Sequence, residues 1–220
     1  MKKIPFIITL VLLFVISISS VIFFTLYPRF IYEYSEKYNG YLVTDFKGVK
    51  SEITIPKTYK DKNVVGIGER AFYKNNKLEK VIFESEHIIV IEKLAFSECT
   101  SLNEIDLSKV DNIERNAFSY DSSLVSINLN AINLGSSVFY GCTSLEKINL
   151  GDNLKTIGSF IFAKSKINTL TFPITLETVA EDTFAEMTNL KEINIYKNRV
   201  INGINYLNSL EGIKINNLSN

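Results

Sequence analysis

The chain is poor in the residues that carry most enzyme chemistry. Its 220 residues include one histidine and two cysteines. No serine or cysteine nucleophile can be placed beside His87 by pattern, so the sequence does not indicate a catalytic dyad or triad. No His/Cys cluster has metal-ligand spacing, and no Gly-rich phosphate loop follows a predicted strand. We therefore expect a protein that is not an enzyme and that holds no cofactor and no metal ion.

The chain also lacks an excess of charge of either sign. Its 24 basic and 24 acidic residues cancel. Without Lys2, Lys3 and Arg29, residues 30–220 keep 21 basic and 24 acidic residues, a net charge of −3. Nucleic-acid-binding domains normally present a basic stripe. We therefore expect no nucleic-acid partner.

An internal repeat organises most of the chain. A phenylalanine returns every 21 to 24 residues, and a motif of the form Leu-x-x-Ile-x-Leu follows it. The repeated residues are Phe72, Phe96, Phe118, Phe139, Phe162 and Phe184. The last two apolar positions of the motif are two apart, so a strand points both to one face. One strand cannot bury that face alone, whereas parallel stacking of repeats builds a continuous core. The pattern predicts an α/β-type solenoid with one short parallel strand per ~22 residues and short turns or helical turns around each Phe.

The N-terminal segment is strongly apolar and carries no charge between residues 4 and 28. A helix over residues 4–27 would be about 36 Å long, enough to cross a hydrocarbon core of about 30 Å with some tilt. The lysines before it predict a cytoplasmic N-terminus and an extracellular repeat domain. We expect residues 1–29 to be an uncleaved signal anchor, a single-pass transmembrane helix in the lipid bilayer of the cell membrane.

A cleaved signal peptide is the alternative for the same segment. Residues 4–16 would form its apolar region, and the small residues Ser17 and Ser19 have the spacing of a cleavage site. The protein would then be secreted. Cleavage there would leave the apolar residues 21–24 at an exposed terminus, which favours the anchor.

The remaining boundaries follow from the repeat. Residues 30–39 are expected to be a juxtamembrane linker whose Phe30, Tyr32 and Tyr34 form an aromatic belt at the membrane surface. Residues 40–77 are expected to hold an N-terminal cap and the first rung, and residues 78–206 the regular repeats. Residues 207–220 are expected to hold a C-terminal rung at Leu210, Ile213 and Ile215, followed by a polar tail.

The two cysteines occupy the same position in two repeats. Cys99 and Cys142 each lie three residues after the repeated Phe. Two rungs separate their Cα atoms by roughly 9 to 10 Å, whereas a disulfide needs less than about 7 Å. We expect two free, buried thiols and no disulfide.

The motifs resemble a known family. The stretches ITIP, IGERAF, AFSECTSL, IERNAF and FYGCTSLEKINL are similar to the leucine-rich repeats of the BspA-like type, over residues 40 to about 215. Val138, Ile161 and Thr183 replace the alanine of that pattern. The resemblance implies a bacterial surface protein associated with adhesion and ligand binding, without enzymatic activity typical of the repeat.

The solvent-facing strand centres form the candidate binding surface. On the presumed concave sheet they make one column, named here the central column: Thr54, Ile82, Asp106, Asn128, Asn149, Thr171, Asn194 and Lys214. Glycan sites usually expose aromatic side chains, and this column has none, so an extracellular protein is the favoured partner. Ile82 is the one apolar member and hints at an interaction patch. The alternative is a structural or spacer element of the envelope with no specific ligand.

Overall fold

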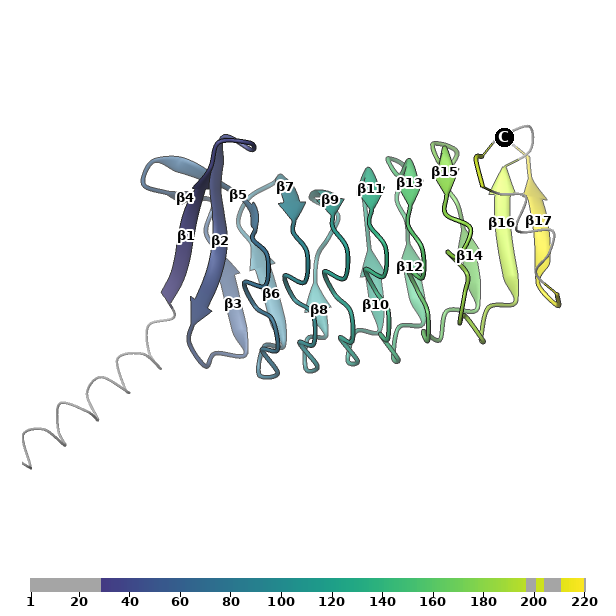
Figure 1. Ribbon diagram of the computed structural model, residues 1–220, viewed down its shortest axis with the longest axis horizontal. Coiled ribbons are helices and arrows are strands. Elements are labelled where there is room, and N and C mark those ends of the chain that lie inside the picture. The colour runs from purple at the N-terminus through teal and green to yellow at the C-terminus, as the bar shows by residue number, and fades with distance from the viewer. Residues whose placement is uncertain (1–28, 197–200, 204–210, 220) are drawn as a thin grey trace, which may run out of the picture.

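The computed structural model describes residues 29–196, 201–203 and 211–219, which form a β-solenoid. Its rungs stack side by side along the long axis of the molecule (Figure 1). Each regular rung contributes two short strands, one to a first ladder that is a single sheet and one to a second ladder that is divided into three sheets. The predicted solenoid of parallel strands is confirmed.

The first ladder is one continuous sheet. Its strands, in spatial order, are β1 (Arg29–Ser35), β2 (Gly40–Lys47), β5 (Lys62–Ile67), β7 (Ile88–Ile91), β9 (Val110–Ile113), β11 (Asn133–Leu134), β13 (Thr156–Ile157) and β15 (Thr178–Val179), and β4 (Thr58–Tyr59) pairs with β5. From β2 onward the neighbours along this order are parallel, while β1 runs antiparallel to β2. This ladder contains the aliphatic pairs that precede each repeated Phe.

The second ladder contains the Ile-x-Leu strands and carries the central column. It consists of β3 (Glu52–Ile55), β6 (Lys80–Phe83) and β8 (Glu104–Ile105), then β10 (Ser126–Asn128) and β12 (Lys147–Asn149), then β14 (Thr169–Thr171), β16 (Glu192–Tyr196) and β17 (Lys214–Leu218). We call its solvent-facing side the β3–β17 face. The prediction of one strand per repeat was wrong, because the aliphatic pair of each rung is also extended and pairs with its counterpart.

Between the two ladders lies the phenylalanine column. The rings of Phe72, Phe96, Phe118, Phe139 and Phe162 are stacked, with successive centroids 4.9 to 5.9 Å apart and ring planes within 14° of parallel. All five side chains are at most 2% exposed. Aromatic side chains bury a large apolar area per residue, so this column makes an extended apolar contact between successive rungs.

The segment around each Phe is a series of turns, and the described residues contain no helix. The N–H of Asn75 donates to the carbonyl of Phe72 (2.9 Å), and Lys74 between them has a φ of 61°. That geometry is a type II turn, whose third residue is left-handed. The N–H of Phe72 donates to the carbonyl of Ala95 in the next rung (2.8 Å). The predicted helical turns were wrong, because left-handed residues such as Lys74 interrupt a helical run and N–H groups such as that of Phe72 bond across to the next rung.

The N-terminal cap begins earlier than the sequence indicated. Arg29–Ser35 is strand β1, within the segment expected to be a linker. Tyr32 stacks on Tyr59 (4.0 Å), and Phe30 packs on Phe46 (5.3 Å). Burial, with the nearby Tyr59, raises the pKa of Tyr32 to about 12. These aromatic side chains cover the N-terminal end of the core. A belt at a membrane surface stays a prediction.

The predicted membrane span, residues 4–27, and the alternative cleavage site lie outside the described residues. In the part of the chain that the structure describes, no helix has the length and apolar character needed to cross a bilayer.

Candidate functional site

Seven of the eight residues predicted for the central column face away from the core and are aligned in two runs, from Thr54 to Asn149 and from Thr171 to Asn194, with no strand pairing between β12 and β14. Direct pairing joins Thr54 to Ile82, Asn128 to Asn149, and Thr171 to Asn194. The bridge between Leu107 and Leu129 aligns the residues just before them, which are Asp106 and Asn128. These side chains point away from the core because the residues beside them in each strand are inward-facing and apolar.

Lys214 was assigned to the wrong column. It pairs with Glu192, and Asn216 pairs with Asn194. The C-terminal strand therefore sits two residues away from the predicted alignment, and Asn216 completes the central column. Side chains of a strand repeat every two residues, so a shift of two keeps the same face inward and leaves no trace in the hydrophobic pattern.

The C-terminal end of the central column is a hydrogen-bonded ladder. The Asn194 side-chain amide donates to Thr171 Oγ1 (3.0 Å), and that of Asn216 donates to Asn194 Oδ1 (2.8 Å). The Asn216 amide also contacts the Glu192 carboxylate. These polar groups satisfy one another, so this end of the face is pre-ordered and offers few free donors.

The N-terminal half of the face is hollowed around Ile82. A depression of about 430 Å³ is lined by Lys80, Val81, Ile82, Phe83, Asn103, Glu104, Ile105, Asp106, Lys109, Ser126 and Asn128. Ile82 is 36% exposed, although its in-strand neighbours Val81 and Phe83 are buried. Lys80 forms an ion pair with Glu104 (2.6 Å) across the same depression. The site therefore combines an accessible aliphatic side chain with charges of both signs.

Lys109 is one of the lining residues that the strand pattern did not predict. It follows β8 outside the strand register and forms an ion pair with Glu86 at 3.0 Å. The alternation of residues in a strand predicts which side chains belong to the central column. It does not predict where a loop residue such as Lys109 lies, and only the folded chain places Lys109 at this depression.

The two cysteines are free and fully buried, as expected from their spacing. Cys99 Sγ donates to the Phe72 carbonyl (3.0 Å), and Cys142 Sγ donates to the Phe118 carbonyl (3.1 Å). Burial raises the pKa of both thiols, and the nearby Asp121 carboxyl raises it further. Thiols in such surroundings are poor nucleophiles, because the thiolate is the reactive form.

Asp121 occupies the equivalent position in the rung between the two cysteines and is 0% exposed. Its Oδ1 accepts a hydrogen bond from the Cys99 backbone N–H (2.8 Å), and its Oδ2 has no hydrogen-bond partner among the described residues. Burial raises the pKa of this carboxyl well above its usual range. Alignment of the repeats in the sequence already places Asp121 at the position that holds Cys99 and Cys142 in the neighbouring repeats.

His87 lies in the connection between β6 and β7, whereas Asp121 and the two cysteines follow the repeated Phe of their rungs. Its ring Nε2 is 2.6 Å from Asp111 Oδ2, and its side chain is 62% exposed. Ser85 Oγ donates to the His87 backbone carbonyl (2.7 Å) and not to the ring. Across residues 29–196, 201–203 and 211–219 no group of three or more His, Cys, Asp or Glu side chains is placed to hold a metal ion.

The fold and its repeating motif define a leucine-rich repeat solenoid. The profile of the BspA type leucine rich repeat region matches residues 46–134 and 111–219, in six copies. The chain belongs to this family. None of the curated proteins compared with it is significantly similar in sequence.

Three solved structures are similar to this chain. The leucine rich repeat protein TpLRR of T. pallidum is 26% identical with a TM-score of 0.69, over 74% of this chain and 78% of that one. A leucine rich cell surface protein of Faecalibacterium prausnitzii is 20% identical with a TM-score of 0.58, over 74% of this chain and 52% of that one. The pneumococcal vaccine antigen PcpA is 23% identical with a TM-score of 0.56, over 76% of this chain and 41% of that one. The last two likenesses concern the fold alone.

Proposed function

We propose that the chain is a non-catalytic binding module on the outer face of a bacterial cell, and that it takes a protein partner on the β3–β17 face around Ile82. The observation that carries this proposal is the depression of about 430 Å³ with an exposed aliphatic side chain among paired charges. Membership of the BspA type family supports a surface-exposed binding role, since the resemblance implies adhesion and ligand binding.

A protein partner suits the chemistry of this face better than a glycan does. Protein interfaces have an apolar centre with a polar rim, and Ile82 has Lys80, Glu104 and Asp106 around it. Paired charges of both signs would fix the register of a partner more than they would raise its affinity. No aromatic ring stands in the central column for a sugar to stack on.

A photo-crosslinking pair tests the site. A photoreactive amino acid placed at position 82 of the full chain, displayed on intact cells, is expected to crosslink one extracellular protein. The same amino acid at position 174 serves as the control, because Ile174 is exposed to a similar degree, 43% against 36%, and lies outside the depression. Equal crosslinking from both positions would count against the site.

A binding measurement with the captured partner completes the test. Ile82→Asp is expected to weaken binding by at least about tenfold, the effect of losing about 1.4 kcal/mol of contact. Ile174→Asp should leave it unchanged. Unchanged binding by Ile82→Asp, with the fold intact by circular dichroism, would refute the proposal.

We further propose that residues 4–27 anchor the module in the membrane of the cell that makes it. The lysines before this apolar segment and its length support the anchor. Intact mass and carbonate-resistant membrane association of the mature protein are the expected result. A mass lacking about the first 19 residues, with protein in the medium, would mean a cleaved signal peptide instead.

A further inference from the structure

The N-terminal end of the solenoid is stepped. β3 and β5 belong to the same rung, but the first ladder continues past β5 with β2 and β1, whereas no described strand lies beyond β3. Strands in a sheet are about 4.8 Å apart, so the second ladder stops about 10 Å short of the first. Figure 1 shows β1 and β2 at this end, beyond the rung that holds β3.

The outer edge of β3 presents backbone groups that no described strand pairs with. The carbonyls of Ser51 and Ile55 accept hydrogen bonds from the β6 side, from Lys80 and Glu84. In a parallel ladder alternate residues bond to opposite neighbours. The N–H and C=O groups of Glu52 and Thr54 therefore point to the open edge. Such an edge is a template for a further strand.

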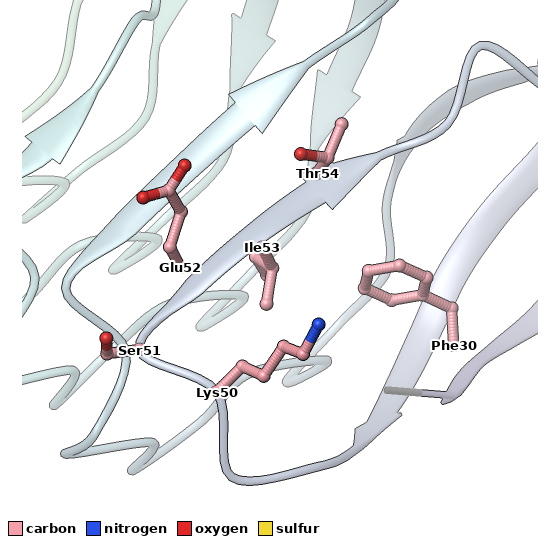
Figure 2. A pocket seen from close by; sticks show the side chains of 6 residues that line it. All are labelled: Phe30, Lys50, Ser51, Glu52, Ile53 and Thr54. Atoms are coloured by element: carbon pink, nitrogen blue, oxygen red, sulfur yellow. The ribbon is translucent and has the colours of Figure 1, made fainter. Parts of the chain in front are cut away.

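A depression lies along this edge. It has a volume of about 570 Å³ and is lined by Phe30 from β1 and by residues 50–54. In Figure 2 the Lys50 amino group extends toward the Phe30 ring, and the Glu52 carboxylate lies on the far side of the strand. Phe30 and Ile53 are the apolar residues of its lining, and Ile53 lies almost fully buried at its base.

Lys50 is the cation of this depression, and no ion pair joins it to another described residue. Glu52 also lines the depression, but its carboxylate lies on the other side of the strand from Phe30 (Figure 2). Lys80, opposite Glu52 in the β3–β6 register, forms its ion pair with Glu104. The side of the depression that faces Phe30 therefore offers one cation beside an aromatic ring, next to backbone groups that no described strand pairs with.

We propose that β3 is a docking edge for an extended peptide segment of another protein, which adds to the second ladder as one more strand. The peptide places an apolar side chain against Phe30 and Ile53, and an aspartate or glutamate beside Lys50. Backbone bonds to Glu52 and Thr54 supply affinity that does not depend on sequence, and the apolar and acidic side chains supply specificity. The residues that line this depression differ from those that line the depression around Ile82, so each proposal is tested separately.

The test uses the full chain in a mild detergent and two synthetic peptides. One is about eight residues long, alternates threonine with valine and carries two glutamates, and its counterpart has lysines in their place. Amide exchange measured by NMR is expected to slow at Glu52 and Thr54 when the acidic peptide binds. The amides of Ile53 and Ile55 should not change, because they already face β6.

Two variants isolate the contacts. Thr54→Pro removes only the outward N–H of that residue, a substitution that edge strands tolerate, and is expected to weaken binding by about tenfold, the value of one lost hydrogen bond. Thr54→Val keeps the N–H and is the matched control. Lys50→Glu should reverse the preference from the acidic to the lysine peptide. An acidic peptide N-methylated at alternate residues should not bind the unaltered chain, which tests the backbone bonds without any protein variant.

Three results would overturn the proposal. The first is binding of neither peptide at millimolar concentration, or binding that survives both Thr54→Pro and N-methylation. The second is protection of Glu52 and Thr54 that appears without peptide and rises with protein concentration, which would make a second copy the occupant. The third is the same protection without concentration dependence, which would mean that this chain covers its own edge.

Discussion

Asp121 is the residue whose replacement should change the stability of this protein most informatively. It lies in the middle of the solenoid, fully buried, with Oδ1 bonded to the Cys99 N–H and Oδ2 without a partner among the described residues. The thiols that face it, Cys99 and Cys142, donate to backbone carbonyls instead. Asp121→Asn keeps the acceptor for Cys99 and removes the ionisable group. Asparagine already stands at the equivalent position of the first rung, as Asn75.

The pH dependence of the free energy of unfolding follows from the number of protons that Asp121 binds in the folded and unfolded chain. Burial raises the pKa of Asp121 in the folded chain, whereas an aspartate of the unfolded chain titrates near about 3.9. Between these two values the folded state holds one proton that the unfolded state has released. The free energy of unfolding therefore falls as pH rises through this window, by about 1.4 kcal/mol per pH unit for this one group. Above the folded-state pKa the contribution stops changing.

The comparison to make is the difference between variant and unaltered chain as a function of pH. The asparagine amide brings its own buried donor, which costs about 1 to 3 kcal/mol at every pH. The difference in unfolding free energy should nevertheless shift in favour of the variant by about 1.4 kcal/mol per unit as pH rises from about 4.5. Urea unfolding followed by tyrosine fluorescence suits a chain with 11 tyrosines and no tryptophan. Parallel stability curves between about pH 4.5 and 7.5 would refute the reasoning.

Three further outcomes are expected. Gly141→Ala should cost about 1 to 2 kcal/mol by urea unfolding, because Gly141 has a φ of 73° and its new Cβ would lie 2.7 Å from the Tyr120 ring; an unchanged midpoint would contradict this. Phe118→Ala should cost about 3 to 5 kcal/mol, since it opens a cavity inside the stacked column; a loss below about 1 kcal/mol would mean that the column carries little packing energy. A thiol reagent should modify Cys99 and Cys142 only after unfolding, because both are buried and their pKa values are raised; mass spectrometry of native protein showing rapid labelling would contradict their placement.

The repeat was readable in the sequence because it is redundant. Each rung has apolar residues at the same positions, so a substitution in one rung does not obscure the pattern. The stacking of the repeated Phe residues from Phe72 to Phe162 was therefore predicted correctly. The strand that each rung contributes to the first ladder was not predicted from the sequence. A pair such as Thr156–Ile157 is too short to show a period of two, and its strand character comes from pairing with neighbouring rungs.

The register of the candidate site was predictable from the first rung onward but not at the C-terminal end of the stack. Ile82 and Asn128 were placed correctly because regular rungs flank them on both sides. The predicted register of Lys214 was wrong by two residues. The last rung has only one neighbouring rung to align with, and the sequence before it does not follow the repeat spacing. Lys109 lies outside the strand register and had no predicted place at the depression.

The solenoid, the spacing of its rungs, the phenylalanine column and the burial of both cysteines without a disulfide could be predicted from the amino-acid sequence. All four depend on the spacing of residues within a repeat, which can be measured directly in the sequence. Only the folded chain shows that β1 belongs to the cap, that no described strand pairs with the outer edge of β3 beside Phe30, and that Asp121 Oδ2 has no partner among the described residues. Those features depend on how residues distant in sequence meet at a chain end or across a rung, where no repeated pattern records the contact.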